Sequence, residues 1–317
     1  MKKFDLLHSA AQILQQCMHK ENKNITIFCG EKSQSTAQLI YQAAKELSND
    51  VLLLQMDMAV FFSSSKPQAI LDIISAAGLV VVTDKNITQL KLKNAFKDYT
   101  ETRILCINAP NEQTMNRWMG ANHSRIALHT NKIADIFSIG RRLKMQTPSG
   151  THLDMSIQSS VIVADAPIIN GQARICLLPA GAVNIFPDAG TVNGKLAVNF
   201  IAGSKKQDEP ATLIVKDGLI HQIRGKNNTA ELLRRQLKRR KPDARKIVNF
   251  SIGTNESASF GNSVFEDQKV LGGACVFIGE SEEFNTSQMK STSAVMLSPS
   301  VYIDGRKILE KGYLALN

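Results

Sequence analysis

Cys275 and the acidic side chains around it are the residues of this 317-residue chain whose types could support chemistry. A thiolate can act as a nucleophile or as a soft metal ligand, and hard oxygen ligands could come from Glu256, Glu266, Asp267 and Glu280. However, Cys275 lies in the apolar run ACVFIG, with no histidine near it in the sequence. Because burial raises the pKa of a thiol, the sequence predicts an unreactive Cys275 unless a residue distant in the sequence activates it.

The six histidines do not form a metal-binding pattern. The chain has no HExxH motif and no histidine and glutamate spaced three or four residues apart, as two ligands on one helix face would be. His152 and His221 are the histidines of the second half of the chain. Because a single histidine rarely builds a metal site, the sequence predicts ordinary structural roles for both.

Several segments of the second half follow, in order, the motifs of a known enzyme family. They are TPSGTHL (147–153), LLPAGAVNIFP (177–187), AGTVNGKLAVN (189–199), IVKDGLIHQIRG (214–225), IVNFSIGTNESA (247–258), QKVLGGACVFIG (268–279) and STSAVMLSPSVYIDG (291–305). Together they resemble the aminopeptidase T family of two-metal leucyl aminopeptidases, which is related to the dihydroxypyridine ring-cleaving dioxygenases. The likeness covers most of the chain, with a looser match in the first half.

The resemblance implies metal ligands at positions where this chain has other residues. An acid, a glutamate, a histidine and a His-x-Asp pair are expected, but these positions hold Ala182, Asn249, Cys275, Ala294 and Met296. A tyrosine ligand is expected near residues 282–284, where no tyrosine occurs. Neutral side chains do not offset the charge of two dications, so we expect no metal or other cofactor. The lost His-x-Asp pair also argues against the related iron dioxygenase activity.

Composition indicates a soluble protein of two domains. The length exceeds that of most single cores, and no apolar run reaches the length of a membrane span. The start of the chain lacks the apolar segment of a secretory signal. The five cysteines are scattered without a CxxC pair, which favours buried thiols in a reducing compartment and therefore a cytoplasmic location.

The first half alternates apolar runs with helical patterns. Strands are predicted at 25–29, 51–55, 79–83, 103–107 and 124–128, and helices at about 36–48, 66–77, 86–97, 111–119 and 131–144. Such alternation is typical of a parallel sheet flanked by helices, so residues 1–145 are predicted to form an α/β domain. The fragment GEKS at 30–33 lacks the glycines of a phosphate loop and is interpreted as a helix-capping loop.

The second half, residues 146–317, is predicted to be an α+β domain of mainly antiparallel strands. Asn/Asp-Gly pairs are the strongest local hairpin signals, and they occur at 170–171, 193–194, 217–218 and 304–305. One helix, at 229–241, interrupts this pattern. It carries much of the net charge of +10 and offers a candidate electropositive dock for an acidic partner, formed by Arg234, Arg235, Lys238, Arg239 and Arg240. The simpler interpretation of this segment is a solvated helix face.

Three functional hypotheses follow. The preferred one is a catalytically inactive, metal-free accessory or scaffold protein that binds a peptide or protein partner. Its metal site is degenerate, and the resemblance implies that it forms a homodimer. Its peptide cleft would include Ala182, Asn249, Thr254, Asn255, Glu256, Lys269 and Cys275. The second hypothesis is an active aminopeptidase-type hydrolase with a rebuilt metal site. The third is a basic nucleic-acid-binding protein, which the low aromatic content of 6% disfavours.

Overall fold

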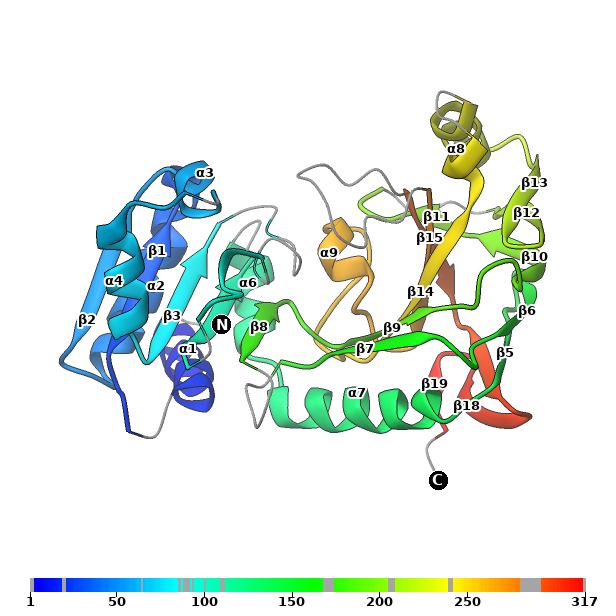
Figure 1. Cartoon of the computed structure of the whole chain (residues 1–317). Coiled ribbons are helices and arrows are strands. Elements are labelled where there is room, and N and C mark those ends of the chain that lie inside the picture. Colours follow the sequence, from blue (N-terminus) through cyan, green and yellow to red (C-terminus); the bar gives the residue numbers. More distant parts are fainter. Residues whose placement is uncertain are drawn as a thin grey trace. The chain divides into compact units, whose positions relative to one another are not determined.

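The computed structural model describes the chain except residues 1, 2, 19, 20, 64, 85, 86, 88–91, 93, 100, 109–111, 168–173, 205–208, 239–241, 280–291, 316 and 317. The chain divides into two compact units (Figure 1). The first unit comprises Met1–Arg125 and Pro167–Ala180, and the second comprises Ile126–Ala166 and Gly181–Asn317. The chain therefore passes between the units three times, whereas the sequence predicted one boundary, between residues 145 and 146.

A parallel sheet of five strands forms the centre of the first unit, in the order β2-β1-β3-β4-β8. Its strands are β1 (Ile25–Cys29), β2 (Val51–Gln55), β3 (Leu79–Thr83), β4 (Arg103–Ile107) and β8 (Ile175–Leu178). All five residues of β3 are buried, as expected for a parallel sheet with both faces covered. The first four strands confirm the sequence prediction with the same bounds.

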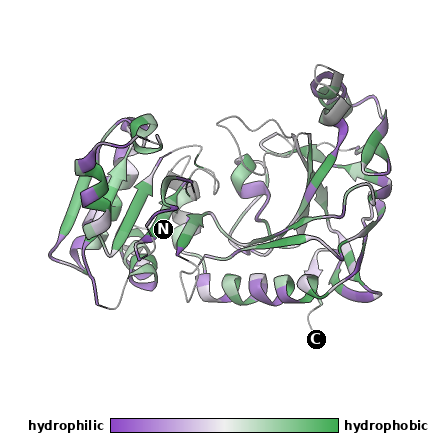
Figure 2. Cartoon of the chain, in the orientation of Figure 1, coloured by the Kyte–Doolittle hydropathy of each residue, from purple (hydrophilic) through white to green (hydrophobic). Residues whose placement is uncertain are grey.

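Helices cover both faces of this parallel sheet. On one face α1 (Lys3–Cys17), α2 (Gln34–Lys45) and α6 (Glu112–Met119) enclose a core that contains Ile27 and Leu105. On the other face α3 (Met58–Phe61) and α4 (Gln68–Ala76) pack over Phe28 and Val80. Figure 2 shows the strands as hydrophobic and the helices as mixed, which is the pattern of amphipathic helices on a buried sheet.

The predicted strand at 124–128 is wrong, because these residues belong to helix α7 (His123–Ser138). The apolar run SRIAL is too short to show whether its period is that of a strand or of a helix. The fifth parallel strand is instead β8, which follows the chain's first passage through the second unit and pairs with β4. Half of the helix predicted at 86–97 lies outside the described residues.

The second unit contains two sheets in which all strand pairs are antiparallel. The eight-stranded sheet has the order β13 (Leu219–Arg224), β12 (Ala211–Lys216), β10 (Asn193–Val198), β6 (His152–Ser156), β5 (Arg142–Gln146), β17 (Ser300–Ile303), β18 (Arg306–Glu310) and β19 (Tyr313–Leu314). The six-stranded sheet has the order β11 (Phe200–Ile201), β16 (Thr292–Leu297), β15 (Gly273–Ile278), β14 (Ile247–Gly253), β9 (Ala182–Phe186) and β7 (Val161–Asp165). This architecture confirms the predicted combination of a helix-flanked parallel sheet with antiparallel sheets.

One large hydrophobic core holds the second unit together. It combines side chains of the eight-stranded sheet, such as Leu143 and Leu213, with Phe250 and Val276 of the six-stranded sheet. Helix α7 adds Ile133 and Phe137, and helix α8 (Asn228–Lys238) adds Leu233 and Leu237. One face of the six-stranded sheet therefore packs against the core, and only its other face can carry a polar site.

Two of the predicted hairpin turns are confirmed. Asp217-Gly218 joins β12 to β13 and Asp304-Gly305 joins β17 to β18, and all four residues have positive φ. The predicted turn at Asn193-Gly194 is wrong, because both residues lie within β10 and pair with β6. There Gly194 allows a close approach, since an added Cβ would lie 2.0 Å from the His152 carbonyl oxygen. The pair at 170–171 lies outside the described residues.

Within the described residues, no helix combines the length and the apolar character that a membrane-spanning helix needs.

Candidate functional site

Strand register divides the residues of the six-stranded sheet between its two faces. Directly opposed residues of an antiparallel pair share a face, and neighbours along a strand alternate. Cys275 opposes both Ser251 and Val295, whereas Phe250 and Val276 point into the large core. The face away from the core, called the polar face here, carries Asp165, Ala182, Asn184, Asn249, Ser251, Cys275 and Ser293, together with the apolar side chains of Val163, Phe277 and Val295.

The structure brings three of the five predicted ligand positions to the polar face. They are Ala182, Asn249 and Cys275, which come from adjacent strands β9, β14 and β15. Ala294 and Met296 lie on the opposite face, where both are fully buried in the large core. The expectation that these two positions belong to the same ligand set as Cys275 is therefore corrected, because a shift of one residue along β16 moves a side chain to the other face.

Backbone hydrogen bonds connect the segments that border the polar face. The Gly181 N–H donates to Asp165 O at 2.7 Å, and the Thr254 N–H donates to Gly181 O at 2.9 Å. The Asn255 N–H donates to Lys269 O at 2.9 Å. Gly253 permits this arrangement because a Cβ there would lie 2.1 Å from the Val270 carbonyl oxygen. The segments that resemble the family motifs are thus held against one another.

A buried ion pair lies at this junction. Lys269 Nζ contacts Asp165 Oδ2, and the two residues are only 7% and 4% exposed. Asp165 is the register partner of Ala182, so the pair lies beside the first predicted ligand position. The sequence singled out Lys269 but missed Asp165, which ends an ordinary apolar strand 104 residues earlier.

Glu266 and Asp267 bind backbone groups. Asp267 accepts the N–H groups of Gly203 and Gly261, both at 2.7 Å, and Glu266 accepts the Ser259 N–H at 3.1 Å. Both residues are buried at α9 (Val264–Asp267). Burial raises the pKa of the Asp267 carboxyl above its ordinary value, against the lowering effect of its hydrogen bonds to Gly203 and Gly261. These two acids therefore stabilise loops in the structure.

Cys275 is a buried and protonated thiol. It is 1% exposed, and its Sγ donates to the Asp267 carbonyl oxygen at 3.7 Å. Burial raises the pKa of the Cys275 thiol to about 12, although the Ser293 hydroxyl and the Lys269 ammonium act in the opposite direction. Since the thiolate is the reactive form, Cys275 is not a nucleophile near neutral pH.

The remaining predicted cleft residues serve different purposes. The Thr254 hydroxyl hydrogen bonds with the Thr130 hydroxyl of α7 at 2.6 Å, and Asn255 Oδ1 accepts the Ser257 N–H at 2.8 Å. Glu256 is exposed. Thr254 and Asn255 therefore position the segment after β14. Besides Asp165, the polar side chains that the sequence missed on the sheet itself are Asn184, Ser251 and Ser293. Nothing in their spacing distinguishes these three residues from structural ones.

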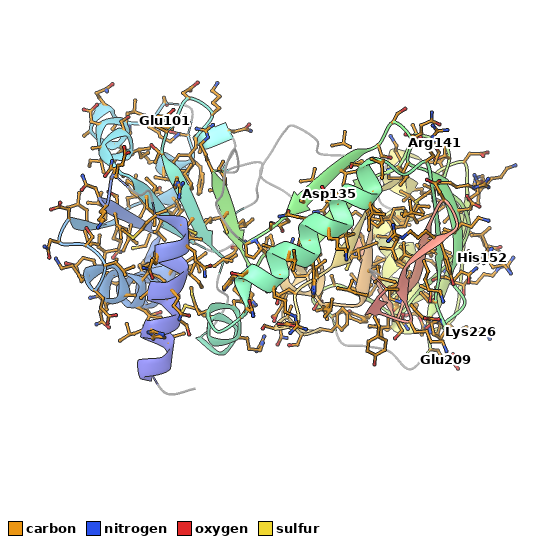
Figure 3. All side chains as sticks on the ribbon, turned by 90° about the horizontal axis from the view of Figure 1, so that it is seen from below. Glu101, Asp135, Arg141, His152, Glu209 and Lys226 are labelled. Atoms are coloured by element: carbon orange, nitrogen blue, oxygen red, sulfur yellow. The ribbon has the colours of Figure 1, made fainter. Side chains whose placement is uncertain are left out.

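The two histidines of the second half lie at the surface of the eight-stranded sheet. His152 is exposed on β6, and His221 is exposed on β13 (Figure 3 labels His152). Neither belongs to the six-stranded sheet, so neither is part of the polar face.

Helix α8 is the predicted basic helix, and one of its arginines makes hydrogen bonds within the fold. Arg234 donates to the carbonyl oxygens of Ile223 and Gly225 at 3.1 and 2.6 Å, while Arg235 is exposed. The Lys238 side chain and residues 239 and 240, where Arg239 and Arg240 were predicted to dock a partner, lie outside the described part of the structure. An electropositive dock here stays a prediction.

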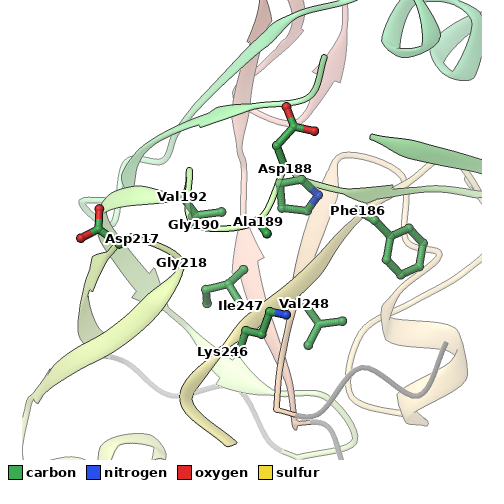
Figure 4. Close-up of a pocket in the computed structure, with 11 residues that line it drawn as sticks. Phe186, Asp188, Ala189, Gly190, Val192, Asp217, Gly218, Lys246, Ile247 and Val248 are labelled. Atoms are coloured by element: carbon green, nitrogen blue, oxygen red, sulfur yellow. The ribbon is translucent and has the colours of Figure 1, made fainter. Parts of the chain in front are cut away.

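A small cavity of about 140 Å³ opens elsewhere in the second unit (Figure 4). It lies between the turns at Asp188–Gly190 and Asp217–Gly218, with Lys246 and Val248 on a further side. The Asp188 carboxylate is already engaged there, because it accepts the N–H groups of Gln158 and Ser159. None of the predicted cleft residues lines this cavity.

The donors on the polar face do not fit the metal set that the resemblance implies. The three mapped positions present a methyl group, a neutral amide and a protonated thiol, and Asp165 is already paired with Lys269. Across the residues that the structure describes, no three histidine, cysteine or acidic side chains converge as a metal site. The region of the implied tyrosine ligand and Glu280 lie outside those residues. The chemistry of this face is therefore considered from its own side chains.

The fold is of the aminopeptidase-T-like type. The family model described as 2,5-dihydroxypyridine 5,6-dioxygenase matches residues 5–315. This chain belongs to that family. It is similar in structure to 2,5-dihydroxypyridine dioxygenase from Pseudomonas putida KT2440, with 17% identity, a TM-score of 0.79 and coverage of 99% of this chain and 98% of that chain.

A second similar structure is wild-type AmpT from Thermus thermophilus. It has 13% identity, a TM-score of 0.63 and coverage of 99% of both chains. A search of curated protein sequences gives no match. At these identities the two structures establish the shared fold, while the family model establishes membership.

The predicted function is wrong in the light of these findings. The family match and the full-length likeness indicate a 2,5-dihydroxypyridine dioxygenase-like enzyme, which contradicts a metal-free, inactive peptide-binding scaffold. They support neither the aminopeptidase-type hydrolase nor the nucleic-acid-binding protein. The prediction relied on the absent ligands and underestimated the relationship to the dioxygenases. A peptide or protein partner, a homodimer and a cytoplasmic location stay predictions.

Proposed function

We propose that this chain is a 2,5-dihydroxypyridine dioxygenase-like enzyme that acts on a small hydroxylated aromatic compound. The observation that carries the proposal is the family match over residues 5–315, which spans both units. The full-length likeness to the Pseudomonas putida dioxygenase supports it.

The polar face suits a ligand of this class. It combines neutral hydrogen-bonding groups of Asn184, Asn249 and Ser251 with the buried ion pair of Asp165 and Lys269. Next to them, Phe200, Phe277 and Val295 form a small apolar cluster with Cys275. Ligand sites commonly pair apolar walls with a few polar groups that fix orientation. In this arrangement the polar groups orient the ring substituents and the apolar cluster excludes water.

The proposal is tested with 2,5-dihydroxypyridine under air. Protein purified without chelator is assayed as isolated and again after addition of ferrous iron, and its metal content is measured. The expected result is loss of the ring's ultraviolet absorbance with matching oxygen uptake, faster than with heat-denatured protein. Equal rates for native and denatured protein in both assays would overturn the proposal.

A further inference from the structure

Lys269 has more hydrogen-bond donors than the structure uses. Its ammonium group carries three N–H donors, and Asp165 is its one side-chain partner within the described part of the chain. With 7% of the residue exposed, water has little access to the remaining donors. Buried donors of a charged group are normally satisfied, so this group is suited to an additional acceptor.

The ammonium of Lys269 contacts Asp165 at one edge of the polar face. Apart from Asp165, the side chains of that face are uncharged, and the Cys275 thiol is protonated. Lys269 lowers the pKa of the Cys275 thiol, whereas the Asp267 carboxylate raises it. The charge of Lys269 therefore acts on a side chain of β15, three strands away from Asp165 on β7.

Ala182 adds no second carboxylate beside the Lys269 ammonium. It opposes Asp165 directly across β7 and β9, and side chains in such positions have Cβ atoms about 5 Å apart. An acid at position 182, as the resemblance implies for relatives, would place a second carboxylate beside the same ammonium. With a methyl group there, Asp165 is the one carboxylate of the described residues that contacts the Lys269 ammonium, which leaves N–H donors for a further negative group.

We propose that Lys269 binds the substrate through a deprotonated ring hydroxyl, and that Asp165 holds the ammonium in place for this contact. The inference rests on the proposed function, because it names how a hydroxylated aromatic compound would be recognised. Lys269 is then a binding residue and Asp165 a positioning residue. The substrate class is an aromatic compound with an ionisable hydroxyl group.

The test compares 2,5-dihydroxypyridine with 2,5-dimethoxypyridine, which cannot form the oxyanion. Binding to the wild-type chain, to Lys269→Arg and to the double variant Asp165→Asn/Lys269→Met is measured by calorimetry over a range of pH. The double variant removes both charges, so it leaves no unpaired buried ion. Lys226→Met, at an exposed position (Figure 3 labels Lys226), is the matched control for loss of one lysine.

The wild-type chain is expected to prefer the dihydroxy compound, with affinity that rises with pH as the ring hydroxyl ionises. The double variant should bind it about 10- to 100-fold more weakly and lose the pH dependence, because a hydrogen bond to a charged group is removed. Lys269→Arg should retain the pH dependence, and Lys226→Met should behave as the wild type.

The outcomes separate this inference from the proposed function. If the wild type binds or converts 2,5-dihydroxypyridine and the double variant does so equally at every pH, the role of Lys269 is overturned while the proposed function stands. If the wild type neither binds nor converts the compound, both are overturned. If the variants do not fold, the wild-type data decide, since equal affinity for the two compounds at every pH contradicts recognition of an oxyanion.

Discussion

Asp267 Oδ2 accepts the backbone N–H of Gly203 at 2.7 Å, across 64 residues of sequence. Its other oxygen accepts the Gly261 N–H, so this carboxylate joins the loop after β11 to the segment before α9. A buried acid therefore holds these two segments together.

Asp267→Asn should destabilise the chain by about 1–3 kcal/mol, because an amide has one acceptor oxygen for two N–H groups. The pH dependence has a definite sign. Burial raises the folded-state pKa of Asp267 above the ordinary value of 3.8, so protonation favours the folded state. The stability of the wild type relative to Asp267→Asn should fall as pH rises from 3.8 through the raised pKa, and then stay constant.

Urea unfolding of the wild type and of Asp267→Asn between about pH 4 and pH 7 measures this difference. Subtracting the two curves removes the contribution of all other titrating groups. A difference that grows with rising pH would contradict the raised pKa.

Gly253→Ala should destabilise the second unit by about 3 kcal/mol or more, because the new Cβ meets the Val270 carbonyl oxygen at 2.1 Å and backbone must move. Gly150→Ala is the matched control. Gly150 has φ +102° and no atom within 4 Å of an added Cβ. The loss of stability in Gly150→Ala therefore measures backbone strain alone and should be about 1–2 kcal/mol. Thermal unfolding of both variants tests the comparison, and equal losses would show that the contact at Gly253 relaxes at little cost.

The cysteines should be unreactive in the folded chain. All five are free and buried, and burial raises the pKa of the Cys275 thiol to about 12. A thiol-specific reagent at about pH 8 is therefore expected to label almost none of them without denaturant, because only the thiolate reacts. In urea all five should react. Rapid labelling of Cys275 in the folded chain, identified by peptide mass spectrometry and absent in Cys275→Ser, would show that the thiol is accessible and activated.

The parallel strands could be predicted from sequence because each is a continuous apolar run that ends at a polar turn. LVVVT at 79–83 is buried at every position, as expected of a continuous apolar run in a strand covered on both faces. SRIAL failed as a strand prediction because its period cannot be judged over five residues, and the helical residues that follow it decide its structure. Asn193-Gly194 failed because tertiary pairing with β6 overrides the local turn preference.

The site was harder to predict than the fold because it depends on contacts between distant residues. Lys269 was chosen from its motif, but its partner Asp165 lies 104 residues away and has no motif of its own. Met296 was assigned to the implied ligand set by motif position, whereas the register with β15 directs it into the core. A sequence match to a motif fixes a residue's place along a strand only to within one position, and that position decides the face.

Helix α8 supports a final prediction about its two sides. Leu233 is fully buried in the large core, so Leu233→Ala should cost about 2–5 kcal/mol through lost burial and a cavity. Arg235 is exposed on the same helix, and Arg235→Ala should change stability by less than about 0.5 kcal/mol. Arg234→Ala should fall between them, because it removes hydrogen bonds to two carbonyl oxygens near the end of β13. Urea unfolding of the three variants gives the order of their losses in unfolding free energy. A loss for Arg235→Ala as large as that for Leu233→Ala would show that the basic side of the helix also stabilises the fold.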